Sequence, residues 1–445
     1  MLTPQSPEKK TTSPAEATET ALLQSLESAV LNDLVDKTWH DLISAGTPLF
    51  DASSSTVTFL FRYSEATALT AQTRQTSQPA SRGDNPDITG VYLFINRITD
   101  KEHVDHGLMR QVPGTDIWIR SVELSPSYRG SYGFRVLSED QPFNARPPHN
   151  GYHTLPDPHC PHQLGATDGY GLSVVAGKHA PAQPHWDNRA PAARGTVLKS
   201  CLSAPDDDDK ADLEVFGYFP THLPPQQKTC GILTLFDAET WFSRLNLPTA
   251  LESAFADKTP PFAVLGIANN TNSDRLRQLG GNAEFLELVG TRGLSWLKEQ
   301  AAAHGLNIDP TLNVIAGQSL GGLSALYAGL LNPQRYSTII AQSPSLWWSP
   351  EPGCTPRDLT LPTHGWITEK TYHSQTPPGH VIIDAGAREG AMVTKAHLLD
   401  MACASRGIDH ELHVYDGGHD QAWWRGALLE HLSQLPLANN NIPTV

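Results

Sequence analysis

The sequence predicts an α/β protein in which a sheet covered by helices on both faces follows a small antiparallel β-sandwich domain. The chain has 445 residues, and a single hydrophobic core stops growing at roughly 250–300 residues, so we expect two domains. Four strand candidates without a long intervening helix fill residues 57–136, and from residue 213 onward strands alternate with helices. Such alternation is typical of a parallel sheet that is buried on both faces.

The N-terminal domain is predicted over residues 21–165, after a tail. Residues 1–20 are rich in Ser, Thr, Pro, Glu and Lys, so we expect a disordered tail. Apolar residues recur at helical spacing from Thr20 to Ser44, which predicts one helix. Turns rich in Pro, Gly and Asn separate the strand candidates, which favours a β-sandwich. The strand candidates are 57–61, 91–95, 118–124 and 132–136. The polar stretch 64–88 is expected to be a surface insertion.

The second domain is predicted over residues 213–437. Residues 166–212 precede it, are dense in Pro, His and Asp, and are expected to form an irregular linker arm. The acidic run 206–210 within this arm is expected to be an exposed, solvated loop. The predicted strands of the second domain are 213–218, 231–236, 262–267, 312–316, 337–341, 381–385 and 411–415. Its predicted helices are 286–304, 322–331, 392–406 and 423–435.

Composition excludes several classes of function. Lys and Arg number 32 against 47 Asp and Glu, and the net charge of −15 argues against a protein that binds nucleic acid or an anionic membrane. No apolar run approaches the roughly 20 residues that span a bilayer, and the N-terminus lacks the apolar core of a signal peptide. We therefore expect a cytoplasmic protein. Its five cysteines are odd in number and contain no CxxC, so we expect reduced thiols and no metal site.

The strongest chemical signal is the segment Gly317-Gln318-Ser319-Leu320-Gly321, which lies between a predicted strand and a predicted helix. A chain that reverses sharply from strand to helix has no room for side chains at the two glycines, and it holds the serine above the sheet. The helix N-terminus then favours negative charge beside that serine. Ser319 is therefore the predicted nucleophile, and the alternative is a structural turn.

A serine nucleophile needs a base, and His419 is the candidate. It follows the last predicted strand and precedes the last predicted helix, in the order Ser, acid, His that is typical of α/β-hydrolases. The acid is expected after the strand 381–385, where Glu389 lies in the turn and Asp384 lies within the strand. We prefer Glu389, since Asp384 would need a buried partner. For the oxyanion, we expect the backbone N–H groups of Leu320 and Ala238.

Several segments together resemble the enterochelin (iron–enterobactin) esterases, an esterase D-like branch of the α/β-hydrolases with an N-terminal accessory β-domain. The resemblance covers roughly residues 35–435, whereas the N-terminal tail, residues 64–88 and residues 186–212 have no counterpart. The C-terminal segments that carry it are 316–330, 342–348, 386–389, 416–420 and 424–426, with 281–285 and Arg275 upstream. The N-terminal segments are 57–60, 114–118 and 129–132.

The resemblance implies hydrolysis of the ester bonds of ferric enterobactin or a related catecholate siderophore, with release of iron in the cytosol. It implies no cofactor, because the iron arrives with the substrate. A ferric tris-catecholate is aromatic and trianionic, so it needs flat side chains and a cation near Ser319. The candidates are Arg275, Trp347, Trp348 and Arg129. Packing of the tryptophans and plain surface charge for the arginines are the alternatives.

Two other functions stay open at this point. The same residues suit a carboxylesterase that acts on another bulky aryl or acyl ester. A non-catalytic protein on this scaffold that binds a siderophore or a sugar is the alternative from a different class. We expect a monomer or a weak homo-oligomer, with neither a nucleic acid nor a membrane as a partner.

Overall fold

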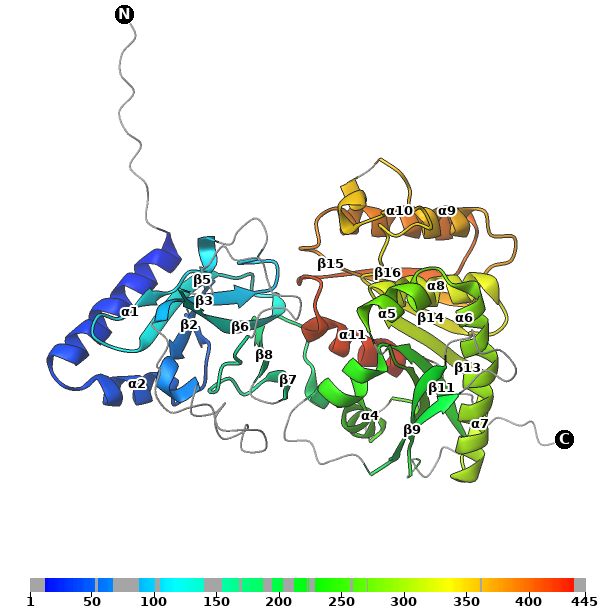
Figure 1. Cartoon of the computed structure of the whole chain (residues 1–445), viewed down its shortest axis with the longest axis horizontal. Coiled ribbons are helices and arrows are strands. Elements are labelled where there is room, and N and C mark those ends of the chain that lie inside the picture. The colour runs from blue at the N-terminus through cyan, green and yellow to red at the C-terminus, as the bar shows by residue number, and fades with distance from the viewer. Residues whose placement is uncertain are drawn as a thin grey trace, which may run out of the picture. The chain divides into compact units, whose positions relative to one another are not determined.

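The computed structural model divides into two units, Met1–Ala180 and Pro181–Val445 (Figure 1). It describes residues 13–52, 55–66, 88–100, 105–139, 154–167, 170–186, 194–202, 212–221, 223, 229–256, 259–269, 271–360 and 362–435. Most of the predicted insertion 64–88 and the whole acidic run 206–210 lie outside these residues.

The N-terminal unit holds two four-stranded antiparallel sheets. One has the order β1-β2-β5-β4 and the other the order β3-β6-β8-β7. Phe59 and Phe61 of β2 pack against Tyr132 and Phe134 of β6, with ring centroids 4.8 Å apart in each pair, so the aromatic core lies between the sheets. The first sheet comprises β1 (Leu49–Phe50), β2 (Thr56–Arg62), β4 (Arg110–Gln111) and β5 (Ile117–Glu123). The second comprises β3 (Ile88–Ile95), β6 (Arg129–Ser138), β7 (Gln163–Thr167) and β8 (Tyr170–Ala176).

Two helices, α1 (Pro14–Leu31) and α2 (Val35–Ile43), occupy the stretch predicted as one helix. The chain breaks between them at Asp33, which has a φ of 56°. Helix α1 also begins inside the stretch predicted to be disordered, because Ser13 and Glu16 form a reciprocal capping box at its start. The prediction of disorder was wrong for residues 13–20, since composition alone does not register a cap, and residues 1–12 lie outside the described residues.

The C-terminal unit is built on an eight-stranded sheet of order β16-β15-β14-β13-β11-β12-β10-β9. The strands from β12 to β16 in this order are parallel, whereas β10 pairs antiparallel with β12 and with β9. The strands are β9 (Thr196–Leu202), β10 (Leu213–Phe219), β11 (Thr229–Phe236), β12 (Phe262–Ile267), β13 (Asn307–Gln318), β14 (Thr338–Gln342), β15 (His380–Gly386) and β16 (His410–Tyr415). The sheet is therefore mixed at one edge, where the sequence predicts parallel strands throughout.

The stretch 166–212, predicted as an irregular arm, contains β8 and β9. Strand β9 lies at the edge of the large sheet, and its burial alternates between half-buried and exposed. An edge strand of this kind carries little apolar signal, so the surrounding Pro and Asp residues dominated the sequence pattern.

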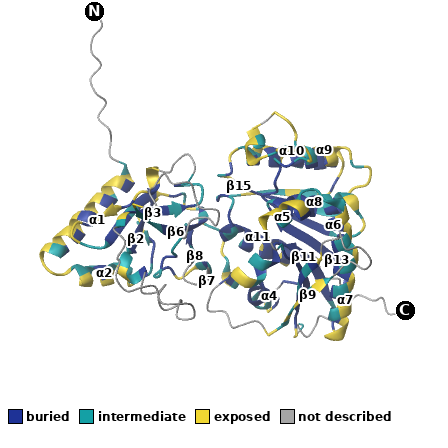
Figure 2. Cartoon of the chain, viewed as in Figure 1, coloured by how far each residue is buried: buried dark blue, intermediate teal, exposed yellow. Residues whose placement is uncertain are grey.

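Helices cover both faces of the large sheet. Ile383 of β15 belongs to the core cluster that also contains residues of α7, α8 and α10. Its neighbour Asp384 points to the opposite face, where it contacts His431 of α11. Figure 2 shows the central strands β11 and β13 as buried. The α-helices are α4 (Leu247–Phe255), α5 (Asn272–Leu279), α6 (Ala283–Leu288), α7 (Leu294–Ala303), α8 (Leu320–Leu331), α9 (Trp366–Tyr372), α10 (Ala391–Ser405) and α11 (Gln421–Gln434).

The predicted helix 286–304 is interrupted, because the π-helical turn η4 (Val289–Gly293) joins α6 to α7. A second π-helical turn, η3 (Glu239–Arg244), follows β11.

The sheets of the two units confirm the predicted fold class: a helix-covered α/β sheet after an antiparallel β-sandwich. None of the helices that the structure describes combines the length and apolar composition that a bilayer crossing needs.

Candidate active site

Ser319 occupies a sharp turn between β13 and α8. Its backbone has φ 57° and ψ −118°, a conformation that non-glycine residues rarely adopt. A Cβ atom on Gly317 would lie 2.2 Å from the backbone C and O of Gly321, and one on Gly321 would lie 3.1 Å from Cβ of Phe236. The turn thus requires glycine at residue 317 and leaves little space at residue 321.

Hydrogen bonds hold Ser319 in this conformation. Its N–H donates to the carbonyl of Gln342 (3.0 Å), and its own carbonyl accepts from the N–H groups of Leu323 (3.1 Å) and Ser345 (2.9 Å). The hydroxyl oxygen lies 3.2 Å from Oγ of Ser345. The loop after β14 therefore fixes both the backbone and the side chain of Ser319.

Glu389 and His419 are in direct contact. Nδ1 of His419 lies 2.7 Å from Oε2 of Glu389. The residue Glu389 is 4% exposed. Oε1 of Glu389 accepts hydrogen bonds from the hydroxyl of Ser343 and the N–H of Gly386 (2.9 Å). Burial alone would raise the pKa of Glu389, but the hydrogen bond and charge of His419, with the other two donors, hold it below its usual value. The carboxylate is therefore ionised and oriented toward the imidazole.

Asp384, the alternative acid, contacts a different histidine. Its two carboxylate oxygens lie 2.9 and 3.1 Å from Nε2 of His431, and both side chains are buried. Burial acts to lower the pKa of His431, but the charge and hydrogen bond of Asp384, with Glu430 and Glu411 nearby, raise it. Asp384 thus has the buried partner that its position demands, and Glu389 is the carboxylate that contacts His419.

The candidate residues lie at one edge of the sheet. Ser319 follows β13, Ser343 follows β14, Glu389 follows β15 and His419 follows β16, and these strands are neighbours in that order. Adjacent strands are about 4.8 Å apart, so the nucleophile strand lies about 10 Å from the strand that precedes the acid.

The intervening loops are linked by contacts. The indole N–H of Trp424 donates to Ser343 Oγ (3.0 Å), and the Trp424 ring stacks edge-on against the His419 ring at 4.8 Å. Arg388 donates to Asp416 (3.0 Å), which joins the acid loop to the histidine loop. A hydroxyl, an imidazole and a buried carboxylate at one edge are the parts of a nucleophilic hydrolase site.

The two candidate oxyanion donors also lie at this edge. Leu320 is the first residue of α8, so its N–H has no acceptor within the helix. Ala238 is buried and immediately precedes η3. It follows Asp237, whose φ is 59°. Both N–H groups thus belong to turns that directly follow parallel strands.

Arg275, a predicted substrate cation, forms a bidentate ion pair with Asp237. Its Nε lies 2.6 Å from Oδ1 and its Nη2 lies 2.8 Å from Oδ2. Burial acts to lower the pKa of Arg275, but Asp237, with Glu239 nearby, raises it above its usual value. Its Nη2 also lies 3.5 Å from the carbonyl of Gln318. The guanidinium therefore links the turn before Ala238 to the residue before Ser319, and it is not an isolated surface charge.

The other predicted substrate residues differ in setting. Trp348 is 9% exposed, and its ring packs 4.9 Å from the ring of Trp366. A Cβ on Gly281 would lie 2.5 Å from its ring. Trp347 is half-buried. Arg129 begins β6 in the N-terminal unit, and burial lowers its pKa to about 10. The Trp348 ring is therefore packed against Trp366 and Gly281.

The sequence prediction missed Ser343, Ser345 and Asp237 as parts of the site. Ser343 and Asp237 directly follow strands β14 and β11, and Ser345 is two residues further along. A polar residue directly after an apolar parallel strand is the signal that could have found the first two.

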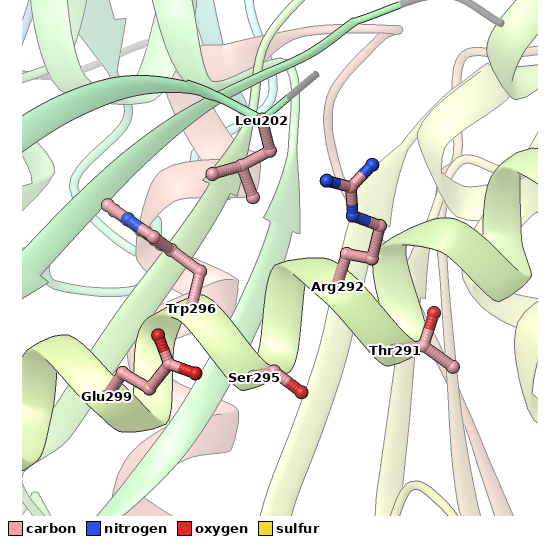
Figure 3. Close-up of a pocket in the computed structure, with 6 residues that line it drawn as sticks. All are labelled: Leu202, Thr291, Arg292, Ser295, Trp296 and Glu299. Atoms are coloured by element: carbon pink, nitrogen blue, oxygen red, sulfur yellow. The ribbon is translucent and has the colours of Figure 1, made fainter. Parts of the chain in front are cut away.

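A cavity of about 390 Å³ lies elsewhere in the C-terminal unit. It lies against η4 and α7, and Figure 3 shows the residues that line it. They are Leu202, Thr291, Arg292, Ser295, Trp296 and Glu299. None of them is a predicted site residue, so this cavity is separate from the edge that carries Ser319.

Comparison with known proteins links both units to one family. Residues 210–435 match the family described as "Putative esterase", and residues 56–186 match "Enterochelin esterase, N-terminal". The iron(III) salmochelin esterase of Escherichia coli O6:H1 (strain CFT073) is 30% identical over 372 residues, which cover 78% of this chain and 84% of that protein. The iron(III) enterobactin esterase of Dickeya dadantii (strain 3937) is 30% identical over 419 residues, which cover 88% of this chain and 91% of that protein.

Solved structures give the same result for the fold. The enterobactin esterase of Shigella flexneri, crystallised in the presence of 2,3-di-hydroxy-N-benzoyl-serine, aligns with a TM-score of 0.64 and 25% identity. The alignment covers 85% of this chain and 92% of that one. The ferric enterobactin esterase of Salmonella typhimurium aligns with a TM-score of 0.68 and 24% identity. This alignment covers 89% of this chain and 98% of that one.

These matches confirm the resemblance that the sequence motifs predicted, and they extend over both units of the chain. The chain belongs to the enterochelin esterase family and is an ester hydrolase.

Proposed function

We propose that this protein hydrolyses the ester bonds of ferric enterobactin or a related catecholate siderophore, and that this releases iron in the cytosol. The observation that carries the proposal is the buried 2.7 Å contact between Glu389 and His419, at the sheet edge where Ser319 lies in a strained turn. The names of the relatives, iron(III) enterobactin and salmochelin esterases, supply the substrate class.

In the proposed mechanism, Ser319 Oγ attacks an ester carbonyl while Nε2 of His419 takes its proton. Glu389 holds the His419 tautomer through Nδ1 and stabilises the imidazolium that forms. The N–H groups of Leu320 and Ala238 donate to the oxyanion. The proton on His419 then passes to the leaving alcohol, and water hydrolyses the acyl-enzyme with His419 again as base. We assign the reaction no cofactor, and the iron belongs to the substrate.

For substrate binding we propose Trp347 as a flat contact and Arg275 as a cationic residue. Asp237 and the Gln318 carbonyl together take three of the five N–H donors of the Arg275 guanidinium, so the remaining donors of this group can meet an anion. Trp347 is half-buried against the core, and its remaining accessible surface supports stacking with a catechol. Because the net charge is −15, binding of a trianion requires such local cations.

The test is incubation of the purified protein with ferric enterobactin, with the linear products followed by mass spectrometry. Ser319→Ala should abolish product formation, whereas the exposed control Ser295→Ala should leave it unchanged. No linear product beside rapid hydrolysis of simple aryl esters would instead indicate a carboxylesterase on another bulky ester. Absence of Ser319 labelling by a fluorophosphonate, with the siderophore still bound, would indicate a binding protein.

A further inference from the structure

Three strained residues follow three adjacent parallel strands. Asp237 after β11, Ser319 after β13 and Ser343 after β14 have φ values of 59°, 57° and 42°. Non-glycine residues seldom adopt positive φ, and they keep it only where the surroundings enforce it. Each of these residues belongs to the candidate site: Asp237 precedes Ala238, Ser319 is the nucleophile, and Ser343 donates to the acid. Something beneath the site must therefore hold these three strand ends together.

Beneath these residues, a chain of side-chain hydrogen bonds crosses the sheet. The indole N–H of Trp241 donates to Gln318 Oε1 (2.8 Å), and Gln318 Nε2 donates to Gln342 Oε1 (2.9 Å). Gln342 Nε2 donates to Asp384 Oδ2 (2.9 Å), and Asp384 binds His431 Nε2. We name these five residues, Trp241, Gln318, Gln342, Asp384 and His431, the strand-end ladder.

Strand register explains why the ladder is continuous. Gln318 pairs with Gln342 between β13 and β14, and Gln342 pairs with Asp384 between β14 and β15. The three side chains therefore point to the same face at the same height of the sheet. Trp241 from η3 and His431 from α11 close the two ends.

The ladder is buried, and its hydrogen bonds have a single direction. Its five side chains are at most 4% exposed. An indole N–H can only donate and a carboxylate can only accept, so the two glutamine amides between them must align head to tail. Gln342 Nε2 also donates to the carbonyl of Trp424 (3.1 Å), so its amide makes three hydrogen bonds. A buried amide with all three bonds made has one stable orientation.

The ladder residues also bind the backbone of the strained residues. The N–H of Ser319 donates to the carbonyl of Gln342 (3.0 Å), and the N–H of Ser343 donates to the carbonyl of Asp384 (2.8 Å). Gln318 and Gln342 are the residues immediately before Ser319 and Ser343. The ladder residues therefore hold the backbone of Ser319 and Ser343 with their carbonyls, while their side chains bind one another.

We propose that the strand-end ladder is a positioning device, which holds Ser319 and Ser343 in the geometry that the reaction needs. This proposal rests on the function proposed above. A ladder that only stabilises the core would affect the free energy of unfolding alone. A positioning ladder also sets the reactivity of Ser319 in protein that is still folded.

Gln342→Met is the central test, because it keeps the length of the side chain and removes its three hydrogen bonds. The readouts are the second-order rate constant for labelling of Ser319 by a fluorophosphonate, the kcat and KM for an aryl ester, and the melting temperature. We expect labelling and kcat to fall by about 10²-fold with little change in KM, as for a reacting group displaced by about 1 Å. Gln278→Met is the matched control, since Gln278 is 6% exposed and lies outside the ladder; its labelling rate should equal that of the wild type.

Labelling of Gln342→Met at the wild-type rate, with a lower melting temperature, would overturn the proposal and leave the ladder a structural role only. If Gln342→Met does not fold, Trp241→Phe decides instead, because it removes one donor at the end of the ladder. A labelling rate below that of the wild type supports the proposal, and an unchanged rate rejects it. A wild-type protein that is not labelled would refute the proposed function itself, and the ladder would lose its catalytic role with it.

Discussion

Replacing Glu389 by Gln is the sharpest test of the assigned acid. The carboxylate accepts from Ser343 and Gly386 through Oε1 and contacts His419 through Oε2. A glutamine whose amide oxygen takes the place of Oε1 turns its amide N–H toward Nδ1 of His419. Nδ1 must then accept, so the proton moves to Nε2, where the ring can no longer take a proton from Ser319. The opposite amide orientation places two donors, the Gly386 N–H and the amide, against each other.

The size of the effect follows from the geometry. Two unit charges about 4 Å apart interact by about 4 kcal/mol at an effective dielectric constant of about 20, which corresponds to about 10³-fold in rate. The His419 side chain is 32% exposed, and solvent screening lowers this value. We therefore expect kcat to fall by about 10²–10³-fold, with little change in KM.

The assay is steady-state hydrolysis of ferric enterobactin and of an aryl ester by Glu389→Gln, with the exposed Glu351→Gln as a matched control. Circular dichroism and a melting curve establish that the variant is folded. A folded Glu389→Gln protein that retains more than a third of the wild-type kcat would refute the role assigned to this carboxylate.

Two further predictions concern the charges around the site. The lowered pKa of Glu389 means that its contribution to stability is complete above the usual glutamate pKa of about 4.3 and is lost as the pH falls through the lower folded value. Urea unfolding between pH 7 and pH 3 should therefore show a shallower loss of stability for Glu389→Gln than for the wild type; parallel curves would contradict this. Asp237→Asn leaves the Arg275 guanidinium without its carboxylate, so we expect a loss of about 3 kcal/mol in the free energy of unfolding together with a lower kcat. The exposed Asp41→Asn should change neither quantity, and an Asp237→Asn protein as stable as the wild type would show that the ion pair does not hold the turn before Ala238.

The strand and helix pattern could be predicted from the sequence wherever one face or both faces of an element are fully buried. The apolar runs that became β11, β12, β13, β14 and β15 were visible for this reason. The Ser319 turn was visible because Gly317 and Gly321 flank it between such a strand and a helix. His419 and Glu389 could be chosen because chain order and position after a strand restrict the candidates.

The remaining features depend on contacts between residues that are distant in the sequence. Strand β9 forms because it pairs with β10 at the edge of the sheet. The local sequence of β9 contains no pattern that indicates this pairing. The same holds for Arg275, whose charge was visible but whose ion pair with Asp237 crosses 38 residues. A sequence does not distinguish an exposed charged side chain from one in an ion pair. The Arg275 guanidinium could therefore be interpreted as an isolated substrate cation.

Asp384 illustrates how a buried polar residue can be interpreted from its position in a strand. It ends an apolar run of β15, as Gln318 and Gln342 end the runs of β13 and β14. A lone polar residue in such a place would be costly, since burial without a partner carries a penalty of about 1–3 kcal/mol. Three of them at the same register become partners for one another, and the cost of each is offset by its neighbour. The expectation that Asp384 needs a buried partner is therefore confirmed. Its partners are Gln342, at the end of the neighbouring strand, and His431. Polar residues that end adjacent parallel strands are best read together, as one network beneath the site, before any of them is assigned to the reaction.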